Sequence, residues 1–188
     1  FPTVAAFNDG TLAVSWLQES AQISYSYDIN IVLSHDAGQT WGAPIQPHDD
    51  QSMRQHGFLT LLPTAQDEML AVWLDARGYN SQDLRGSFDN AVQLRSTTIG
   101  KDGTLGRDTP LDLRACSCCQ TSASITGDGT VLAAYRDRTA DEIRDISIVR
   151  RHNGAWSDPV NIHADGWEIS GCPVNGPAID AQATDAVV

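Results

Sequence analysis

The sequence predicts an all-β protein, a β-propeller whose four-stranded antiparallel blades surround a common axis. Short apolar strands recur about every 60 residues, and several strands fit within each repeat. Turn residues separate these strands, and the 188 residues include 15 Gly and 8 Pro. No segment has the apolar period of a helix to compete with the strands.

The repeat is clearest in three segments that begin with a turn and continue as an apolar strand ending in an aromatic residue. Leu12, Leu70 and Leu132 occupy the same place in the three segments, and their nearly equal separations define the repeat. Each repeat also has a second strand pair, with turns at 101–103 and 153–154 in two of them. The strand pattern predicts that Leu12, Val14, Leu70, Val72, Leu132 and Ala134 are buried.

The repeats divide the chain into about three blades and the start of a fourth. The expected boundaries are 1–50, 51–113, 114–170 and 171–188. A propeller that stopped there would leave strand edges unpaired. We therefore interpret the sequence as a fragment of a larger protein.

One turn motif has five fixed positions, all of which this chain matches. The stretch 34–41 fits the pattern Ser-x-Asp-x-Gly-x-Thr-Trp. Asp at such a turn accepts hydrogen bonds from backbone amides, and Gly adopts positive φ. The neighbouring Ser, His and Asp do not form a catalytic triad, because consecutive strand residues point to opposite faces. The predicted structural residues are Ser34, Asp36, Gly38, Thr40 and Trp41, and Trp41 is expected to pack against its own blade.

The four cysteines lie in two clusters, at the starts of the third and fourth predicted blades. Neighbouring blade starts converge, so a disulfide from Cys118 or Cys119 to Cys172 is expected, with Cys116 also assigned to this disulfide group. Free thiols and a soft-metal site are the alternatives. The offset that relates Leu70 to Leu132 also makes His56 equivalent to Cys118. The alternative metal ligands are His56, Cys118, Cys119 and Cys172; no metal or other cofactor is expected.

Charged residues gather near the ends of the repeat strands. Asp75 and Asp137 occupy equivalent positions and are the predicted catalytic residues. Eleven of the twelve basic residues are arginines, which form bidentate pairs with carboxylates. The alternative is a solvated loop with weak surface ion pairs. The predicted ligand-binding residues are Arg54, His56, Arg77, Arg136, Arg138 and Asn175.

The turn motif resembles the Asp-box, or BNR repeat, of the sialidase (neuraminidase) superfamily. The segments Cys-Ser-Cys-Cys-Gln-Thr, Tyr-Arg-Asp-Arg and Gly-Cys-Pro-Val-Asn-Gly-Pro are also similar to poorly characterised bacterial sialidase-like proteins. The resemblance implies a six-bladed propeller when complete. It also implies an acidic sugar as substrate, held by three arginines, with a Tyr nucleophile activated by Glu and an Asp acid/base. The family's early Phe/Tyr-Arg-Ile-Pro motif is absent from this sequence.

Composition narrows the choice of partner and location. The net charge of −12 disfavours nucleic acid and anionic membrane surfaces. No apolar run approaches the roughly 18 residues of a membrane span. We expect an exported propeller, periplasmic or extracellular, that binds a carbohydrate or a small acidic ligand without assured catalysis. The alternatives are an exo-sialidase-type glycoside hydrolase and a metal-binding or redox propeller that uses the cysteines.

Overall fold

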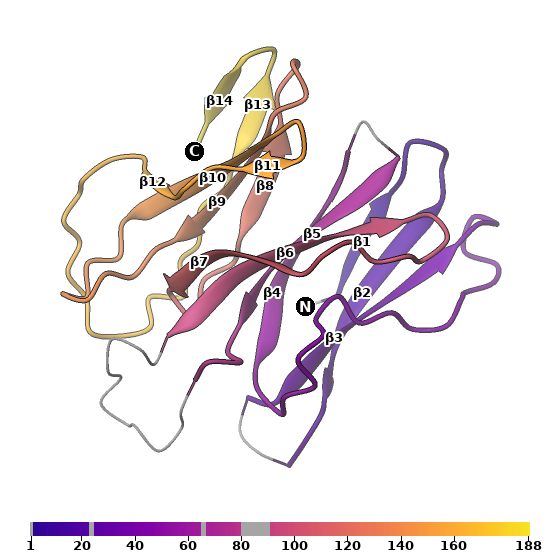
Figure 1. The fold of residues 1–188 in the computed structure, drawn as a ribbon, viewed down its shortest axis with the longest axis horizontal. Helices are drawn as coiled ribbons and strands as arrows, with labels where there is room; N and C mark the ends of the chain where they lie inside the picture. Colours follow the sequence, from indigo (N-terminus) through magenta and orange to yellow (C-terminus); the bar gives the residue numbers. More distant parts are fainter. Residues whose placement is uncertain (1, 23–24, 65–66, 80–90) are drawn as a thin grey trace.

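The computed structural model describes residues 2–22, 25–64, 67–79 and 91–188. Within these ranges the regular structure consists of strands in antiparallel sheets, without a helix. The sheets lie side by side as in an open fan, and they do not close into a ring (Figure 1). The chain is thus a partial β-propeller, which confirms the predicted fold class. No helix in the described part of the chain is long and apolar enough to cross a membrane.

The first sheet contains β1 (Thr3–Ala6), β2 (Leu12–Glu19) and β3 (Tyr27–Ser34) in that order. Ile45 adds a short fourth edge, because its backbone exchanges hydrogen bonds of 2.7 and 2.9 Å with Ile31. Three strands and one bridge therefore take the place of a regular four-stranded blade.

The second sheet is four-stranded, in the order β4 (His56–Pro63), β5 (Glu68–Asp75), β6 (Val92–Gly100) and β7 (Thr109–Ala115). Strand β5 is buried on both faces because a neighbouring sheet covers each side. Leu70, Val72 and Leu74 belong to a core shared with the third sheet. Met69, Ala71 and Trp73 belong to a core shared with the first sheet. The continuous apolar run of β5 is what such two-sided burial requires.

The third sheet runs in the order β11, β10, β9, β8, and β12 also pairs with β10. A two-stranded sheet of β13 and β14 follows. The bounds are β8 (Ser122–Ile125), β9 (Val131–Arg136), β10 (Ile146–His152), β11 (Ala155–Trp156), β12 (Val160–Asn161), β13 (Asp180–Gln182) and β14 (Asp185–Val187).

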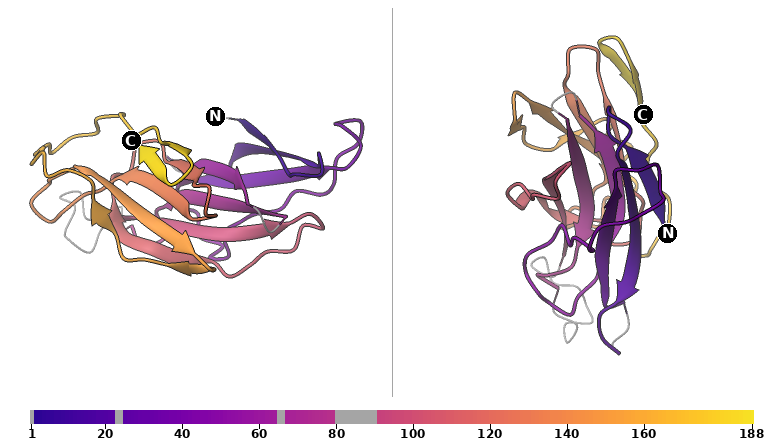
Figure 2. Two further views of the ribbon diagram at one scale, coloured as in Figure 1. Left: turned by 90° about the horizontal axis from the view of Figure 1, so that it is seen from above. Right: turned by 90° about the vertical axis from the view of Figure 1, so that its right-hand side faces the viewer.

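The first strands of successive sheets are neighbours. Strand β4 contacts β1 and β8, and β13 contacts β8. Two further views show that the whole array is elongated and shallow (Figure 2). The chain segments that enter β4, β8 and β13 are therefore brought toward one another at one end of these strands.

The burial prediction is confirmed in the second and third sheets but is wrong in the first. Leu12 and Val14 are only half-buried, whereas Ala13 and Ser15, which alternate with them, are buried. The reason is that the Ala13 face of β2 packs on the second sheet, while the other face points away from it. The residues confirmed as buried are Leu70, Val72, Leu132 and Ala134.

The turn motif after β3 is held by its own side chains. Asp36 accepts hydrogen bonds from the Ser34 hydroxyl at 2.8 Å and from the Thr40 amide and hydroxyl at 2.8 and 2.6 Å. The bonds from the Thr40 hydroxyl and amide lower the pKa of Asp36 to about 2. Gly38 has φ +87°, and a Cβ there would lie 3.6 Å from the ring of Trp41, which is 43% exposed. Trp41 therefore lies over its own turn rather than inside the blade.

The two-sided burial of β5 yields the first prediction. Leu70→Ala should lower the free energy of unfolding by about 2–5 kcal/mol, because it leaves a cavity between the second and third sheets. The matched control is Val4→Ala, since Val4 is 68% exposed. Urea unfolding followed by tryptophan fluorescence measures both. Equal stability of the two variants would show that the shared core does not support the fold.

Candidate functional site

A pocket of about 390 Å³ opens where the blade starts converge. Its wall combines the turn before β3, the segment before β4, the end of β5 and the segments before β8 and β13. Two tyrosine rings stand at this pocket, with Tyr25 exposed by 70% and Tyr79 by 36%. The described lining residues are Tyr25, Ser26, Met53, Arg54, Gln55, Phe58, Ala76, Tyr79, Val92, Ser117, Cys118 and Cys172.

A β-bulge in β4 forms one wall of the pocket. The register with β5 shifts between Gly57 and Thr60, and Phe58 within the bulge has φ +54°. The hydroxyl of Thr121 donates to the Phe58 carbonyl at 2.7 Å, and the Thr60 hydroxyl donates to the Thr121 carbonyl at 2.8 Å. The third sheet thus fixes the strained backbone that presents Phe58 to the pocket.

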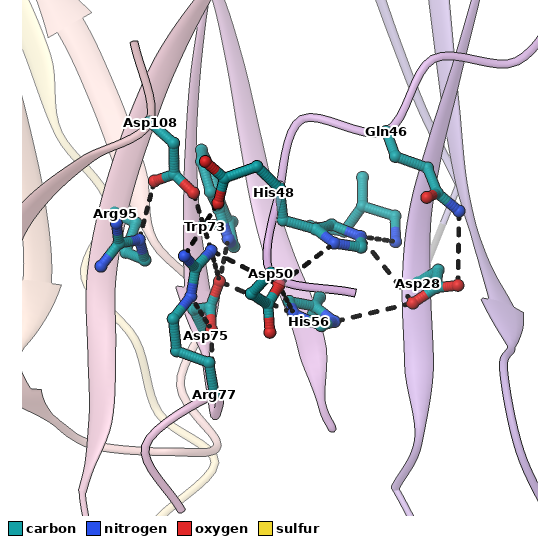
Figure 3. A network of polar contacts seen from close by, with 12 residues as sticks. Asp28, Gln46, His48, Asp50, His56, Trp73, Asp75, Arg77, Arg95 and Asp108 are labelled. Carbon is teal, nitrogen blue, oxygen red and sulfur yellow. Dashed lines mark hydrogen bonds and ion pairs between the residues drawn. The ribbon is translucent and has the colours of Figure 1, made fainter. Parts of the chain in front are cut away.

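Directly behind this wall, His56 is fully buried among acceptors (Figure 3). Its Nδ1 lies 3.0 Å from the Tyr27 carbonyl, and its Nε2 lies 3.0 Å from Asp50 Oδ1. A carbonyl and a carboxylate only accept, so both ring nitrogens donate and His56 is an imidazolium. Burial opposes the charge, but the hydrogen bond to Asp50 and the charge of Asp75 outweigh it and raise the pKa of His56.

Asp75, a predicted catalytic residue, is also fully buried. It accepts hydrogen bonds from the Trp73 indole at 2.9 Å and from the Arg77 guanidinium at 2.8 and 2.9 Å. Arg77, a predicted ligand residue, also binds Asp108 at 2.7 Å and Asp49 at 3.1 Å. Both residues are therefore engaged inside an ion-pair network between the first two sheets (Figure 3).

Asp137, the second predicted catalytic residue, lies half-buried in the third blade. It accepts hydrogen bonds from the Arg138 amide at 2.6 Å and the Ser147 hydroxyl at 3.1 Å. Burial and the charge of Asp112 raise its pKa. The Tyr135 hydroxyl donates to Asp112, and burial raises the pKa of Tyr135 as well. Because Tyr135 is only 1% exposed, this tyrosine–carboxylate pair belongs to the core.

The remaining predicted ligand residues lie at the end of β9 and in the segment before β13. The buried guanidinium of Arg136 donates to the Asn175 carbonyl at 2.6 Å and lies 4.6 Å from the ring centre of Trp167. Arg138 forms an ion pair with Glu142 at 2.6 Å. The structure thus brings Arg54 to the pocket, whereas the other predicted arginines are not among the described residues that line it.

The states of the four cysteines confirm the predicted disulfide to Cys172 and correct the assignment of the other two cysteines. Cys118 and Cys172 form a disulfide with a Cα–Cα distance of 6.1 Å, as predicted. Cys116 and Cys119 are buried free thiols, so their assignment as disulfide residues is wrong. The backbone register also differs from the prediction that His56 is equivalent to Cys118: Ala115, rather than Cys118, pairs opposite Asp137 as His56 pairs opposite Asp75. The alternative metal set is therefore not assembled.

A second group of metal-ligand types lies beside His56. Ligand atoms of Asp28, His48 and His56 lie within 4.8 Å of one another, and the two imidazole rings stack at 3.7 Å. As an imidazolium, however, His56 has no lone pair for a metal. The Ile29 amide already donates to His48 Nε2 at 3.3 Å. The group is better described as an ion-pair network than as a metal site.

The sequence did not single out the pocket aromatics. Tyr25 and Tyr79 lie outside strands, where an aromatic side chain has no period to mark it as core or surface. Phe58 lies inside an apolar strand and has the pattern of a core residue until the bulge turns it. The one available signal was that Tyr25 and Tyr79 occupy equivalent places, each between the second and third strands of its sheet.

No family model matches the chain, and no curated protein matches it. Solved structures show a likeness in fold. A protein of unknown function from Dyadobacter fermentans has a TM-score of 0.61 at 15% identity, over 89% of this chain and 50% of that one. An ulvan lyase, a polysaccharide lyase, has 0.56 at 12% identity, over 89% and 44%. The NanB sialidase from Streptococcus pneumoniae has 0.56 at 10% identity, over 88% and 24%. The chain thus spans about half or less of these structures, and the likeness shows the propeller fold.

The His56 network predicts a specific pH dependence of stability. The folded pKa of His56 is raised, so its contribution is complete below about pH 6.5 and is lost as pH rises through the folded value. His56→Gln should lower the free energy of unfolding near neutral pH by about 3–5 kcal/mol, because Asp50 loses its nearest cationic partner, at 3.0 Å, and Asp75 loses a charge at 3.7 Å. It should also remove this alkaline decline, measured by urea unfolding across pH.

His163 provides the matched control, because its side chain is 78% exposed and pairs only with Asp165 at 2.9 Å among the described residues. His163→Gln should retain the wild-type pH profile. If His56→Gln retains the wild-type pH profile as well, the buried imidazolium does not stabilise the contact between the first two sheets.

Proposed function

We propose that the chain is part of an exported β-propeller that binds a carbohydrate in the pocket at the blade starts. The observation that carries this proposal is the pair of exposed rings, Tyr25 and Tyr79, on a pocket of about 390 Å³. The apolar C–H faces of a sugar pack on aromatic rings, and rings that also carry a hydroxyl suit a half-wet surface. Pockets of this volume are typical of small-ligand sites.

Polar groups around the rings supply hydrogen bonds for sugar hydroxyls. Gln55, Ser117 and Arg54 line the same pocket, and Arg54 is the single charged side chain among its described lining residues. A guanidinium matches the geometry of one carboxylate. A sugar with a single acid group is therefore our preferred ligand, despite the negative charge of the chain.

The contacts of the predicted catalytic residues favour ligand binding over catalysis. Asp75 is saturated by Trp73 and Arg77, and Tyr135 is buried in the core. Asp137, with its raised pKa, is the remaining predicted acid, but it is not among the residues that line the pocket. An exo-sialidase-type activity would thus need residues beyond those described.

The location that we propose, periplasmic or extracellular, rests on the disulfide. Cys172 is exposed, so a reducing compartment would give small thiols access to its bond with Cys118. Disulfides at such positions persist in oxidising compartments.

The test is titration calorimetry of the full-length protein with three probes. These are sialic acid, a glucuronate–rhamnose sulfate oligosaccharide and arabinobiose, chosen to separate acidic from neutral sugars. Tyr25→Ala and Tyr79→Ala should each weaken binding by about 2- to 10-fold, because each removes one stacking ring. Arg54→Gln should weaken the acidic probes and spare arabinobiose.

The matched control is Trp41→Ala, which removes a half-exposed ring at the turn after β3, outside the pocket. It should leave every affinity unchanged. Binding of any probe that is unaffected by both tyrosine variants would place the ligand elsewhere, and no binding of any probe would contradict a site for these sugars.

A further inference from the structure

Three cysteine sulfurs meet at the start of the third blade. Cys116 Sγ lies 3.4 Å from Cys119 Sγ and 3.8 Å from Cys118 Sγ. Cys118 is bonded to Cys172, whereas Cys116 and Cys119 are free. The free thiols are separated by two residues, the spacing of redox-active Cys-x-x-Cys pairs. A reduced pair therefore lies in direct contact with an oxidised pair.

The surroundings give the two free thiols different roles. Arg144 Nη1 donates to Cys116 Sγ at 3.2 Å, and Glu142 holds the same guanidinium at 2.7 Å. The hydrogen bond from Cys119, with help from Arg144, lowers the pKa of Cys116 despite burial. The neighbouring Cys116 and burial raise the pKa of Cys119. Cys116 is thus the thiolate, and Cys119 keeps its proton.

We propose that Cys116 and Cys119 are a redox-active pair that exchanges electrons with the Cys118–Cys172 disulfide. The Cys116 thiolate attacks Cys118 Sγ, the Cys116–Cys118 bond forms, and the Cys118–Cys172 bond breaks. Cys172 leaves as a thiolate and takes a proton from solvent. This step needs no partner outside the chain.

In the second step Cys119 loses its proton and attacks Cys116 Sγ. The Cys116–Cys119 bond forms, the Cys116–Cys118 bond breaks, and Cys118 leaves as a thiolate that takes a proton. Two electrons pass from the buried pair to the other pair; Cys119 gives up one proton, Cys118 and Cys172 take up two, and the difference comes from solvent. The chain therefore has two disulfide isomers with the same overall oxidation state.

The two isomers differ in what solvent can reach. Cys116 and Cys119 are buried, while Cys172 is exposed and Cys118 is half-exposed. Exchange converts buried thiols into thiols on the pocket wall, where Cys118 and Cys172 lie. The segment that carries Cys172 keeps a second attachment, because Arg136 binds the Asn175 carbonyl at 2.6 Å. The exchange therefore opens the covalent link without removing this attachment.

The test traps the released thiols. The full-length oxidised protein is incubated with excess N-ethylmaleimide near neutral pH without reductant or denaturant, quenched with acid and mapped by mass spectrometry. Alkylated Cys118 and Cys172 should accumulate together with a Cys116–Cys119 disulfide, at a rate independent of protein concentration. Alkylated Cys116 and Cys119 beside an intact Cys118–Cys172 bond, or no reaction, would overturn the proposal.

Two variants separate the steps. Cys119→Ser should stop after the first step and yield a Cys116–Cys118 disulfide with alkylated Cys172. Cys116→Ser should abolish both products, while Ser124→Ala, on β8 of the same blade, should leave them unchanged. Wild-type alkylation of Cys172 in Cys116→Ser would refute the role of Cys116. If Cys116→Ser does not fold, as judged by circular dichroism, the product of Cys119→Ser still decides the question: a Cys118–Cys172 bond that stays intact in that variant would refute the exchange.

Discussion

The buried carboxylate of Asp75 is the constraint on which the junction of the first two sheets depends. A charge without solvent contact is costly unless it is paired and hydrogen-bonded. Arg77 and Trp73 satisfy Asp75 directly, and the imidazolium of His56 lies 3.7 Å from it. His56 in turn needs Asp50 from the segment between the sheets. The segment between the two sheets must therefore adopt the one conformation that places Asp50 against His56. This conformation also positions Gln55 and the bulge that forms the pocket wall.

Strand β5 has a similar role for the apolar interior. Its alternate side chains enter two separate cores, one toward each neighbouring sheet. The second sheet consequently aligns the sheets on both sides of it, and the polar network lies at the end of the same strand. Apolar burial supplies most of the driving force between the sheets. The ion pairs, which contribute little net stability against apolar replacements, instead set which loops meet.

The sequence was sufficient where local pattern decides structure. The spacing of Leu70 and Leu132 and the hairpin turns predicted the sheets, and the repeat predicted a link from Cys118 or Cys119 to Cys172, which Cys118 makes. Failure came where the partner is distant in sequence and the repeat does not relate the two positions. Arg136 binds a carbonyl 39 residues away, a choice that no local pattern contains. Val14 has a strand pattern like that of Val72, but only Val72 lies in a sheet with neighbours on both faces.

One irregularity explains why the cysteines gather in the third blade. In the second blade, residues 57–59 oppose residues 73–74, which is an ordinary bulge of one extra residue. In the third blade, residues 116–121 span the gap between the Ala115–Asp137 and Ser122–Ala134 pairs, so six residues oppose 135–136. The three additional residues fold into a turn instead of a strand. This turn brings Cys116, Cys118 and Cys119 together and presents Ser117 and Cys118 to the pocket. The repeat alone could not show this, because the offset between Leu70 and Leu132, applied unchanged, assigns Cys118 to the strand position that Ala115 occupies.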